Sequence, residues 1–249
     1  MIRFENVVKQ FGTNRVLDGL DLEIPEGKIT VIIGKSGEGK SVTIKHIMGL
    51  LTPTSGRVFV DDRDLSTFSF EQLMDLRRSI GMLFQHAALF DSLSVFENVA
   101  FPLKERRSMK ESDIKKRVFE VLDQIGLPDI ADKFPGELST GEKKRVGLAR
   151  ALSPNPRIIM YDEPTTGMDP LVSEMIDNLI VDVGRWNPEL TSIVISHDLK
   201  AALETAENVV MLYKGKVQLA GAPDKFRKVD DPIIRQFFAG KVEGPMEFM

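Results

Sequence analysis

The chain contains no cysteine, and it is poor in several other residues with specialised chemistry. Among its 249 residues there are one tryptophan, two tyrosines and three histidines. The lack of cysteine excludes disulfide bonds, thiolate nucleophiles and thiolate metal ligands. It also fits a reducing compartment, where disulfides rarely persist.

Two further absences concern membranes and nucleic acids. No apolar run approaches the roughly 20 residues that a membrane-spanning helix needs, and residues 1–7 alternate like a strand where a secretory signal would be basic and then apolar. The 33 basic and 37 acidic side chains leave a formal charge of −4, which gives no reason to expect a nucleic-acid partner. We therefore expect that any work at a membrane is done through a partner protein.

The patterns that are present predict an α/β protein with an inserted helical subdomain. Apolar alternation in residues 2–7 and 16–24, with a turn at 11–14, predicts a small antiparallel β subdomain at the N-terminus. Short apolar runs then alternate with helical patterns, which predicts a mainly parallel sheet covered on both faces. Residues from about 86 to 152 are mostly helical in pattern and are expected to form the insertion. The expected strands of the parallel sheet are residues 29–33, 80–84, 158–161, 193–195 and 209–212.

The stretch from Gly34 to Ser41 has the spacing of a phosphate-binding loop. It reads Gly, four residues, Gly-Lys-Ser, and it lies between the expected strand 29–33 and a helical pattern that includes Val42. Glycines let the backbone turn tightly and direct its N–H groups at phosphate oxygens, and the start of the helix adds a positive end. Lys40 is expected to reach the outer phosphates of a nucleotide, and Ser41 to coordinate Mg²⁺. The candidate nucleotide-binding residues here are Gly34, Lys35, Ser36, Gly37, Glu38, Gly39, Lys40, Ser41 and Val42.

A second candidate element is the apolar run 158–161, which ends in two carboxylates, Asp162 and Glu163. Ligands of parallel sheets bind at the C-terminal ends of the strands, so these carboxylates are expected beside the bound phosphates. Asp162 would hold Mg²⁺ directly or through water, and Glu163 would polarise the attacking water. Taken alone, such an acidic pair is about as often a solvated part of a loop.

A third motif, together with these two elements, indicates a known family. Residues 138–142 read Leu-Ser-Thr-Gly-Glu, and residues 145–152 read Arg-Val-Gly-Leu-Ala-Arg-Ala-Leu. With these motifs in this order, the chain resembles the nucleotide-binding subunits of ATP-binding cassette (ABC) transporters over residues 1–225. The resemblance implies a P-loop NTPase core of the RecA-like kind and ATP hydrolysis. It adds to the candidate site Gln85 of the Gln loop, Asp169 of the Asp loop, the switch residue His197, and Phe11 as the aromatic residue for adenine.

The family geometry implies two copies that face each other head to tail, with ATP between the phosphate-binding loop of one copy and the signature of the other. Gln85 would contact the metal ion or the water, and His197 the γ-phosphate. Asp169 would connect the two sites across the dimer. The resemblance thus implies ATP and Mg²⁺ as cofactors, a homodimer, and an integral membrane permease as partner. The residues contributed by the second copy would be Ser139, Thr140 and Gly141.

Three residues depart from the commoner form of the family motifs. Thr140 and Glu142 stand where the signature usually has Gly and Gln, and Phe11 replaces the commoner Tyr. Ser139 and the backbone at Gly141 keep the expected donors. Glu142 brings a negative charge that either approaches the γ-phosphate or points away from it. Phe11 keeps the stacking face and lacks only a hydroxyl.

Two other stretches are similar to a narrower group, the MlaF-like ATPase subunits of Mce-linked lipid transporters. They are residues 82–103, around and after the Gln loop, and residues 235–240 with 243–245. This likeness implies transport of phospholipid or another hydrophobic molecule between bacterial membranes, and a peripheral position on the cytoplasmic face of the inner membrane. It also implies an Mce-type substrate-binding protein and a small accessory subunit as further partners.

Other functions use the same cassette. The main alternative is the ATPase subunit of an importer for amino acids or other small solutes, which has the same chemistry and a different permease. A DNA-repair ATPase would carry long coiled-coil heptads, and a translation-type protein would carry two phosphate-binding loops. The sequence has no such heptads and one such loop.

The last segment, residues 226–249, is expected to form a short helix and a tail beyond the ATPase domain of residues 1–225. Its apolar side chains are more numerous than an idle tail needs. We therefore expect this segment to clasp a second copy or an accessory subunit. The side chains concerned are Phe237, Phe238, Met246 and Phe248.

Overall fold

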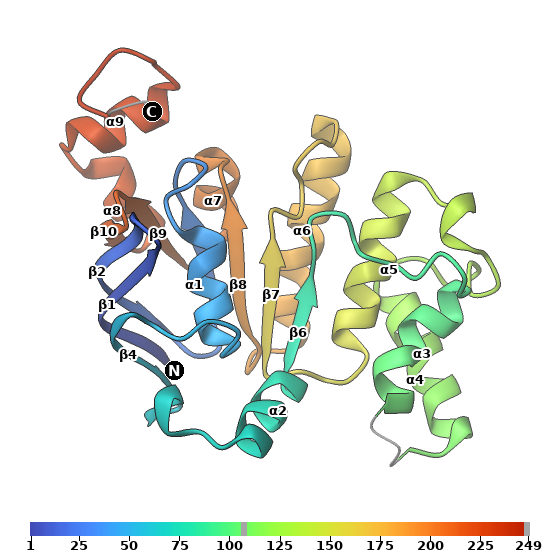
Figure 1. Cartoon of the computed structure of the whole chain (residues 1–249). Coiled ribbons are helices and arrows are strands. Elements are labelled where there is room, and N and C mark those ends of the chain that lie inside the picture. The colour runs from blue at the N-terminus through green and yellow to red at the C-terminus, as the bar shows by residue number, and fades with distance from the viewer. Residues whose placement is uncertain (106–108, 247–249) are drawn as a thin grey trace.

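The computed structural model describes residues 1–105 and 109–246, which form two sheets and a helical body (Figure 1). One sheet has the strand order β2-β1-β4-β5, and the other has the order β10-β9-β3-β8-β7-β6. In the second sheet, β3 pairs in parallel with β8 and β9, and β7 pairs in parallel with β6 and β8. The expected α/β class with a mainly parallel sheet is therefore confirmed.

The first sheet is antiparallel and packs against the helix that follows the phosphate-binding loop. It consists of β1 (Ile2–Phe11), β2 (Asn14–Ile24), β4 (Ser55–Val60) and the short β5 (Arg63–Asp64). Alternate residues of β1 and β2 are buried, as period-two patterning requires. Their buried face shares one core with Ile44 and Ile47 of α1 (Lys40–Ile47). The N-terminal sheet therefore supports α1 directly.

The central sheet separates two cores. Its strands are β3 (Ile29–Ile33), β6 (Ile80–Leu83), β7 (Ile158–Asp162), β8 (Thr191–Ser196), β9 (Asn208–Tyr213) and β10 (Lys216–Gly221). Ile32 faces the core that contains α1, whereas Val31 and Ile33 face the core beneath α6 (Pro170–Trp186) and α7 (Leu199–Thr205). Because both faces are covered, the middle strands are almost continuously apolar.

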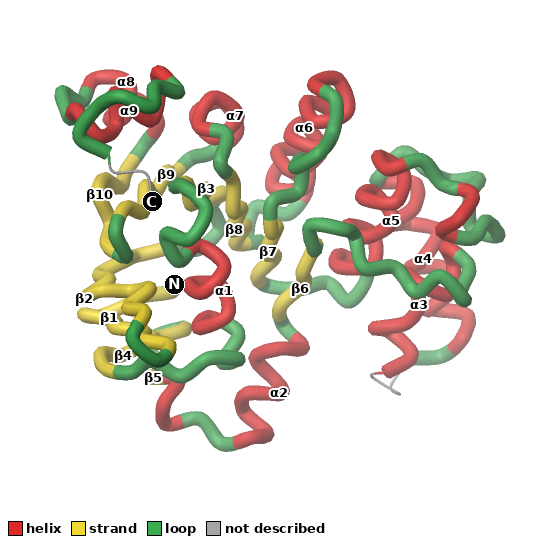
Figure 2. Tube along the Cα trace, turned by 45° about the horizontal axis from the view of Figure 1, so that its top comes forward, coloured by secondary structure: helices red, strands yellow, loops and turns green. Residues whose placement is uncertain are grey.

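The helical body lies beyond the β6 edge of the central sheet, as Figure 2 shows. It contains α3 (Val95–Glu105), α4 (Glu111–Gln124) and α5 (Thr140–Leu152), which share a third core. The helix α2 (Phe70–Arg78) precedes β6 and begins with a capping box formed by Ser69 and Gln72. Two short 3₁₀ turns, Leu65–Thr67 and Pro135–Glu137, complete this part. No helix in the described part of the chain is long and apolar enough to cross a membrane.

The C-terminal segment forms two helices, α8 (Pro223–Lys228) and α9 (Pro232–Ala239), and folds back onto the central core. The expected boundary after residue 225 falls inside α8, and Phe226, Ile234 and Met246 belong to the core beneath α6 and α7. The buried side chain of Gln236 closes the last turn, because it accepts from the Met246 N–H at 2.6 Å and donates to the Val242 carbonyl at 3.1 Å. Residues 247–249, including Phe248 of the expected clasp, lie outside the described residues.

His46 couples the stability of this fold to pH, because its imidazole is buried between the N-terminal sheet and α1. Nδ1 bonds the Val42 carbonyl at 2.8 Å, and the ring lies edge-on to Phe4. Burial lowers the pKa of His46 below its ordinary 6.5, against a smaller raising effect of the bond to Val42, and the charge of Lys9 lowers it further. As pH falls through 6.5, the unfolded chain therefore gains a proton that the folded chain resists, and stability decreases.

Between pH 7 and pH 5.5 we expect His46 to lower the unfolding midpoint in denaturant as pH falls, and we expect this contribution to be absent in His46→Leu. Leu cannot be protonated, so the histidine contribution to the pH slope disappears even if the variant is less stable overall. His86→Leu is the matched control, because His86 is exposed and the variant should keep the slope of the parent chain. Equal slopes in His46→Leu and the parent would show that His46 does not set this dependence.

Candidate functional site

The candidate site residues from four separate stretches of sequence meet at one edge of the central sheet. The strands β3, β6, β7 and β8 run parallel, so their C-terminal ends lie at the same edge. Gly34, Gln85, Glu163 and His197 each follow one of these strands directly or by one residue. In Figure 1 this edge is the upper one, where β3 leads into α1. Parallel α/β sheets bind ligands at this edge.

The phosphate-binding loop between β3 and α1 depends on glycine at two close approaches. A Cβ on Gly34 would lie 2.6 Å from the Leu212 carbonyl oxygen of β9, and one on Gly39 would lie 2.6 Å from the Leu17 side chain. Gly39 also has φ 94°, in the left-handed region that side chains disfavour. The Glu38 carboxylate accepts from the backbone N–H of Lys214, which ties the loop to the turn between β9 and β10. The loop is therefore held in shape from both sides.

Lys40 supplies a buried cation at the start of α1. Its ammonium donates to the carbonyls of Gly34 at 2.7 Å and Lys35 at 2.9 Å, and the residue is 5% exposed. Burial lowers the pKa of Lys40, and the nearby carboxylates of Glu163, Glu38 and Asp162 oppose that shift. The N-cap residue Gly39 offers no side-chain acceptor, so the first N–H groups of α1 face the loop interior without a capping side chain. The loop thus combines a lysine with a helix N-terminus, as an anion site requires.

The donor set for a divalent cation lies next to this lysine. The Ser41 hydroxyl donates to the Asp162 carboxylate at 3.4 Å. The pKa of Asp162 is raised by burial and then by the charge of Glu163, while the Ser41 bond opposes the rise. The described residues contain no cluster of three or more His, Cys, Asp or Glu side chains arranged for a metal ion. One hydroxyl, one carboxylate and the oxygens of a phosphate ligand fit Mg²⁺, which uses few protein ligands.

Glu163 lies directly after Asp162 and is positioned by three contacts. Its backbone has φ 46°, and its N–H donates to the Ile195 carbonyl of β8 at 3.1 Å. Its carboxylate accepts from the Thr166 hydroxyl at 3.0 Å and lies 3.8 Å from Nδ1 of His197. The structure therefore brings together the two residues that the sequence assigned to water activation and γ-phosphate contact. Thr166 was not predicted, although the Pro-Thr-Thr-Gly run after Glu163 is a turn signal.

The aromatic candidate Phe11 ends β1 and leaves a ring face open. The residue is 45% exposed, and the Lys9 ammonium lies 5.1 Å from the ring centroid. Lys9 is held there because it also donates to the Thr52 carbonyl at 2.7 Å. An exposed aromatic ring of this kind can stack on a flat base.

The signature residues begin α5, and the Asp-loop residue begins α6. Ser139 is the N-cap of α5, and Asp169 caps α6 by accepting from the backbone N–H groups of Leu171 and Val172 at 3.1 Å. A Cβ on Gly141 would approach the Val172 side chain to 3.0 Å, so the two helix starts are neighbours. The strands β8, β7 and β6 separate α1 from α5 in the sheet order (Figure 1). The structure therefore does not bring Ser139, Thr140 and Gly141 to the phosphate-binding loop of the same chain.

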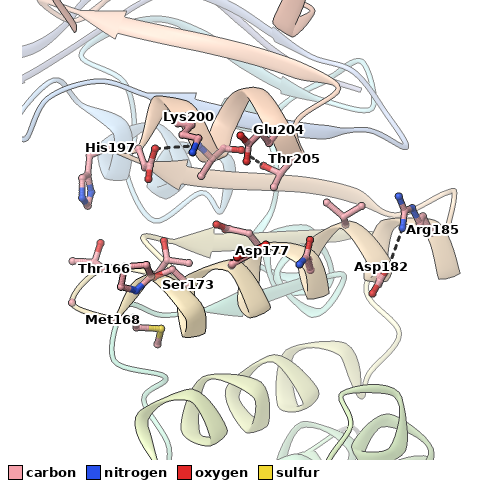
Figure 3. Close-up of a pocket in the computed structure, with 18 residues that line it drawn as sticks. Thr166, Met168, Ser173, Asp177, Asp182, Arg185, His197, Lys200, Glu204 and Thr205 are labelled. Carbon is pink, nitrogen blue, oxygen red and sulfur yellow. Dashed lines mark hydrogen bonds and ion pairs between the residues drawn. The ribbon is translucent and has the colours of Figure 1, made fainter. Parts of the chain in front are cut away.

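A polar groove runs along α6 and α7 and begins beside Thr166 and His197. Figure 3 shows Thr166 and His197 at one end and Arg185 at the other. Asp177 lies between the two helices, and burial raises its pKa to about 6, with further contributions from Asp198 and Glu204. This groove was not predicted, because its acidic residues come from two helices whose sequences have no shared motif. It borders the switch histidine without containing the phosphate-binding loop.

Lys144 is another charged residue that the sequence did not single out. It lies on α5 and is 3% exposed, and its ammonium has no hydrogen-bond partner in the described structure. Burial lowers the pKa of Lys144 to about 8, while the charge of Asp162 opposes that shift. The buried ammonium of Lys144 on α5 therefore interacts electrostatically with the Asp162 carboxylate at the end of β7.

A family model described as ABC transporter matches residues 17–166. This match spans the phosphate-binding loop, the Gln loop, the signature and the acidic pair, which are the elements assembled at the edge of the sheet and at the start of α5. The chain belongs to the ABC transporter family.

Curated relatives cover nearly the whole cassette. The probable ribonucleotide transport ATP-binding protein mkl of Mycobacterium leprae is 38% identical over 98% of this chain and 70% of its own length. The intermembrane phospholipid transport system ATP-binding protein MlaF of Haemophilus influenzae is 38% identical over 100% of this chain and 94% of its own. The methionine import ATP-binding protein MetN of Carboxydothermus hydrogenoformans is 42% identical over 90% of this chain and 66% of its own.

A solved structure extends the likeness to three dimensions. A dimeric ATP-binding cassette in a post-hydrolysis state, bound to ADP and phosphate, superposes with a TM-score of 0.79 at 33% identity. The superposition covers 90% of this chain and 99% of the other. With the family match, this likeness identifies the cassette as an ATPase, and it confirms the expectation of a P-loop NTPase fold.

Proposed function

We propose that the cassette works as a head-to-tail homodimer whose two ATP sites are each completed by the other copy. The observation that carries this proposal is the separation of the signature from the phosphate-binding loop within one chain. Both are accessible, since Ser139 and Thr140 at the start of α5, and Ser36 and Gly37 in the loop, are exposed. A second copy is the simplest source of the missing signature, and the dimeric solved relative supports this arrangement.

In this dimer, the residues of the edge take distinct roles toward ATP. The loop from Gly34 to Val42 would bind the phosphates through its N–H groups and Lys40, and Phe11 would stack on adenine. Glu163 would take a proton from the attacking water, since its carboxylate is already oriented by Thr166. His197, which lies next to Glu163, would contact the γ-phosphate. Ser139, Thr140 and Gly141 would bind that phosphate from the second copy, and Asp169 would connect the two sites.

Mg²⁺ would be held by Ser41 and Asp162, with Gln85 as a further contact to the metal ion or the water. When bound, the ion neutralises phosphate charge during hydrolysis. The protein's own contribution is to keep the hydroxyl and the carboxylate adjacent, as the contact between Ser41 and Asp162 already does. Removal of Mg²⁺ by a chelator should therefore stop turnover.

The coupling of hydrolysis to a membrane permease would involve the turn that follows Gln85. Phe90 in this turn is exposed, and its ring lies 4.8 Å from the ring of Phe101, which is exposed on α3. Arg150 of α5 holds the turn in place, because its guanidinium donates to the carbonyls of Ala87 at 2.8 Å and Ala88 at 2.7 Å. An apolar patch on a rigid support, adjacent to a candidate metal-contacting residue, is well suited to dock a permease loop.

We expect Phe90→Ser to reduce copurification of the cassette with its permease by at least about tenfold, because a central aromatic anchor at an interface commonly contributes that much. ATP affinity of the isolated cassette should change little, since Phe90 does not touch the phosphate-binding loop. Phe70→Ser is the matched control: Phe70 is 74% exposed on α2, away from the turn. If both variants retain the permease equally, docking occurs elsewhere.

The cargo that best fits the similarities is phospholipid or another hydrophobic molecule moved between bacterial membranes. The relative named for intermembrane phospholipid transport aligns with this chain end to end, including the C-terminal segment, whereas the methionine importer extends well beyond it. The cassette would then lie peripherally on the cytoplasmic face of the inner membrane, with a Mce-type protein and a small accessory subunit in the same complex. The amino-acid importer remains the second candidate because of its 42% identity.

Reconstitution distinguishes the two cargos. The cassette and its permease, placed in vesicles with a fluorescent phospholipid in one assay and labelled methionine in a parallel assay, should give ATP-dependent movement of the phospholipid. Movement of methionine without the phospholipid would favour the importer. The Glu163→Gln variant in the same vesicles shows which movement needs hydrolysis.

We also propose that the C-terminal segment binds a second copy or an accessory subunit, since Phe238 and Val242 remain exposed although Met246 is buried. Deletion of residues 241–249 should reduce dimer or accessory-subunit binding by about tenfold or more in pull-down and sedimentation measurements. Met246→Ala, which loses the core contact and keeps the exposed side chains, should bind normally. Normal binding by the deletion variant would rule out the clasp.

A further inference from the structure

The signature serine of the cassette is already engaged by a carboxylate three residues later. The Ser139 hydroxyl donates to Oε2 of Glu142 at 2.7 Å, and the Ser139 N–H donates to the same oxygen at 2.8 Å. The Glu142 N–H in turn donates to Oγ of Ser139 at 3.3 Å. The unusual residue of the signature therefore points toward the serine, and the reciprocal bonds close a capping box on α5.

Glu142 is ionised in this arrangement. The bonds from the Ser139 hydroxyl and then from its N–H lower the pKa of Glu142 below the ordinary carboxyl value, and the positive charges of Lys133 and Arg145 contribute less. The side chain is partly exposed at the surface of the helical body. A negative charge thus stands at the position from which the second copy's phosphate would be contacted.

A serine hydroxyl has one proton to donate, so a phosphate oxygen must compete with Glu142 for it. An oxygen that accepts this proton would lie about 5.5 Å or less from the Glu142 carboxylate, given ordinary hydrogen-bond lengths. Two negative charges at that separation repel even where water partly screens them. A signature with an uncharged residue at this position avoids the repulsion, and it holds the hydroxyl less strongly because a hydrogen bond to a neutral acceptor is weaker.

We propose that Glu142 is a positioning residue that holds the Ser139 hydroxyl away from the incoming γ-phosphate and opposes closure of the ATP-bound dimer. This inference rests on the proposed trans site. Closure requires the hydroxyl to leave Glu142, or the phosphate to be bound by the backbone N–H groups of α5 alone. Either way, the cassette needs a higher ATP concentration to close than one with a neutral residue here.

The test uses Glu142→Gln in the full chain, combined with Glu163→Gln. The second substitution blocks ATP hydrolysis, so the ATP-bound dimer does not dissociate during the measurement. Gln keeps the backbone part of the capping box, because its amide oxygen can accept from the Ser139 N–H. It removes the negative charge, so its bond to the Ser139 hydroxyl is weaker and the phosphate competes for that hydroxyl more easily. We expect the ATP concentration for half-maximal dimerisation, measured by sedimentation, to fall by about tenfold or more. In the chain with Glu163 intact, the KM for ATP should fall by a similar factor, whereas kcat should change by less than about threefold.

Glu137→Gln is the matched control. Glu137 is exposed five residues before Glu142 and accepts from the Phe134 N–H at 2.7 Å, so it caps a short helix with the same charge but does not hold Ser139. Its replacement should leave dimerisation at the parent's ATP concentration. An unchanged or higher ATP requirement in Glu142→Gln, or an equal gain in both variants, would overturn the role of Glu142. If no variant dimerises with ATP, the trans site itself is wrong and the inference falls with it.

Discussion

Glu163→Gln is expected to reduce ATP turnover by at least about 100-fold while ATP affinity changes by less than about threefold. Gln has the shape of Glu and can keep the hydrogen bond from Thr166, but it cannot take a proton from water. The phosphate-binding contacts lie on the loop before α1 and are untouched, so nucleotide should bind normally. The closed dimer should accumulate, because the γ-phosphate that joins the two copies is no longer removed.

Phosphate release and equilibrium nucleotide binding measure the two halves of this expectation separately. Glu174→Gln is the matched control, since Glu174 is an exposed carboxylate on α6 in the adjacent groove. It should retain the turnover of the parent. Near-normal turnover in Glu163→Gln would show that Glu163 is not the general base, and His197 would then be the next candidate.

Lys40→Ala is expected to weaken ATP binding itself, by about 10- to 100-fold, because a hydrogen bond to a charged group contributes about 1.5–3 kcal/mol. The ammonium is nearly buried and is held by two carbonyls of its own loop, so it is already located where phosphate oxygens would replace those acceptors. Loss of the cation leaves the phosphates with backbone N–H groups alone. Binding of a fluorescent ATP analogue measures the effect.

The control for Lys40→Ala is Lys45→Ala, an exposed lysine on the same helix. It removes the same charge from α1 and should leave ATP affinity within about twofold. Both variants should keep the unfolding midpoint near that of the parent, because α1 is supported mainly by Ile44 and Ile47 in the core. Equal losses of affinity in both variants would indicate a general effect of charge, without a specific contact of Lys40.

The sequence alone predicted the features that depend on short-range pattern. The alternation in β1 and β2 and the apolar runs of β3, β7, β8 and β9 indicated strands, because burial on one or both faces imposes a period on the chain. The Gly-x4-Gly-Lys-Ser spacing indicated a phosphate-binding loop, and the order of motifs indicated the family that the comparisons then confirmed. The roles of individual residues in catalysis stay predictions.

Elements of weak pattern were missed. The strand β10 is only partly buried and mixes polar with apolar residues, so its pairing with β9 depends on the Lys214–Gly215 turn, where both residues have positive φ. The helix α8 is six residues long and is kept in place by Phe226, which packs into a core built from distant segments. Such long-range contacts leave no periodic trace in the local sequence.

The phosphate-binding loop, the acidic pair and the signature were thus determined by the sequence itself, since each motif carries its chemistry in adjacent residues. The tertiary structure decided how these parts are placed. It positioned Glu163 between Thr166 and His197, turned Glu142 toward Ser139, and left the signature beyond the β6 edge of the sheet, away from the loop. The physical reason is that the order of strands in a sheet, and the direction of a side chain at a helix start, depend on packing between segments far apart in the chain.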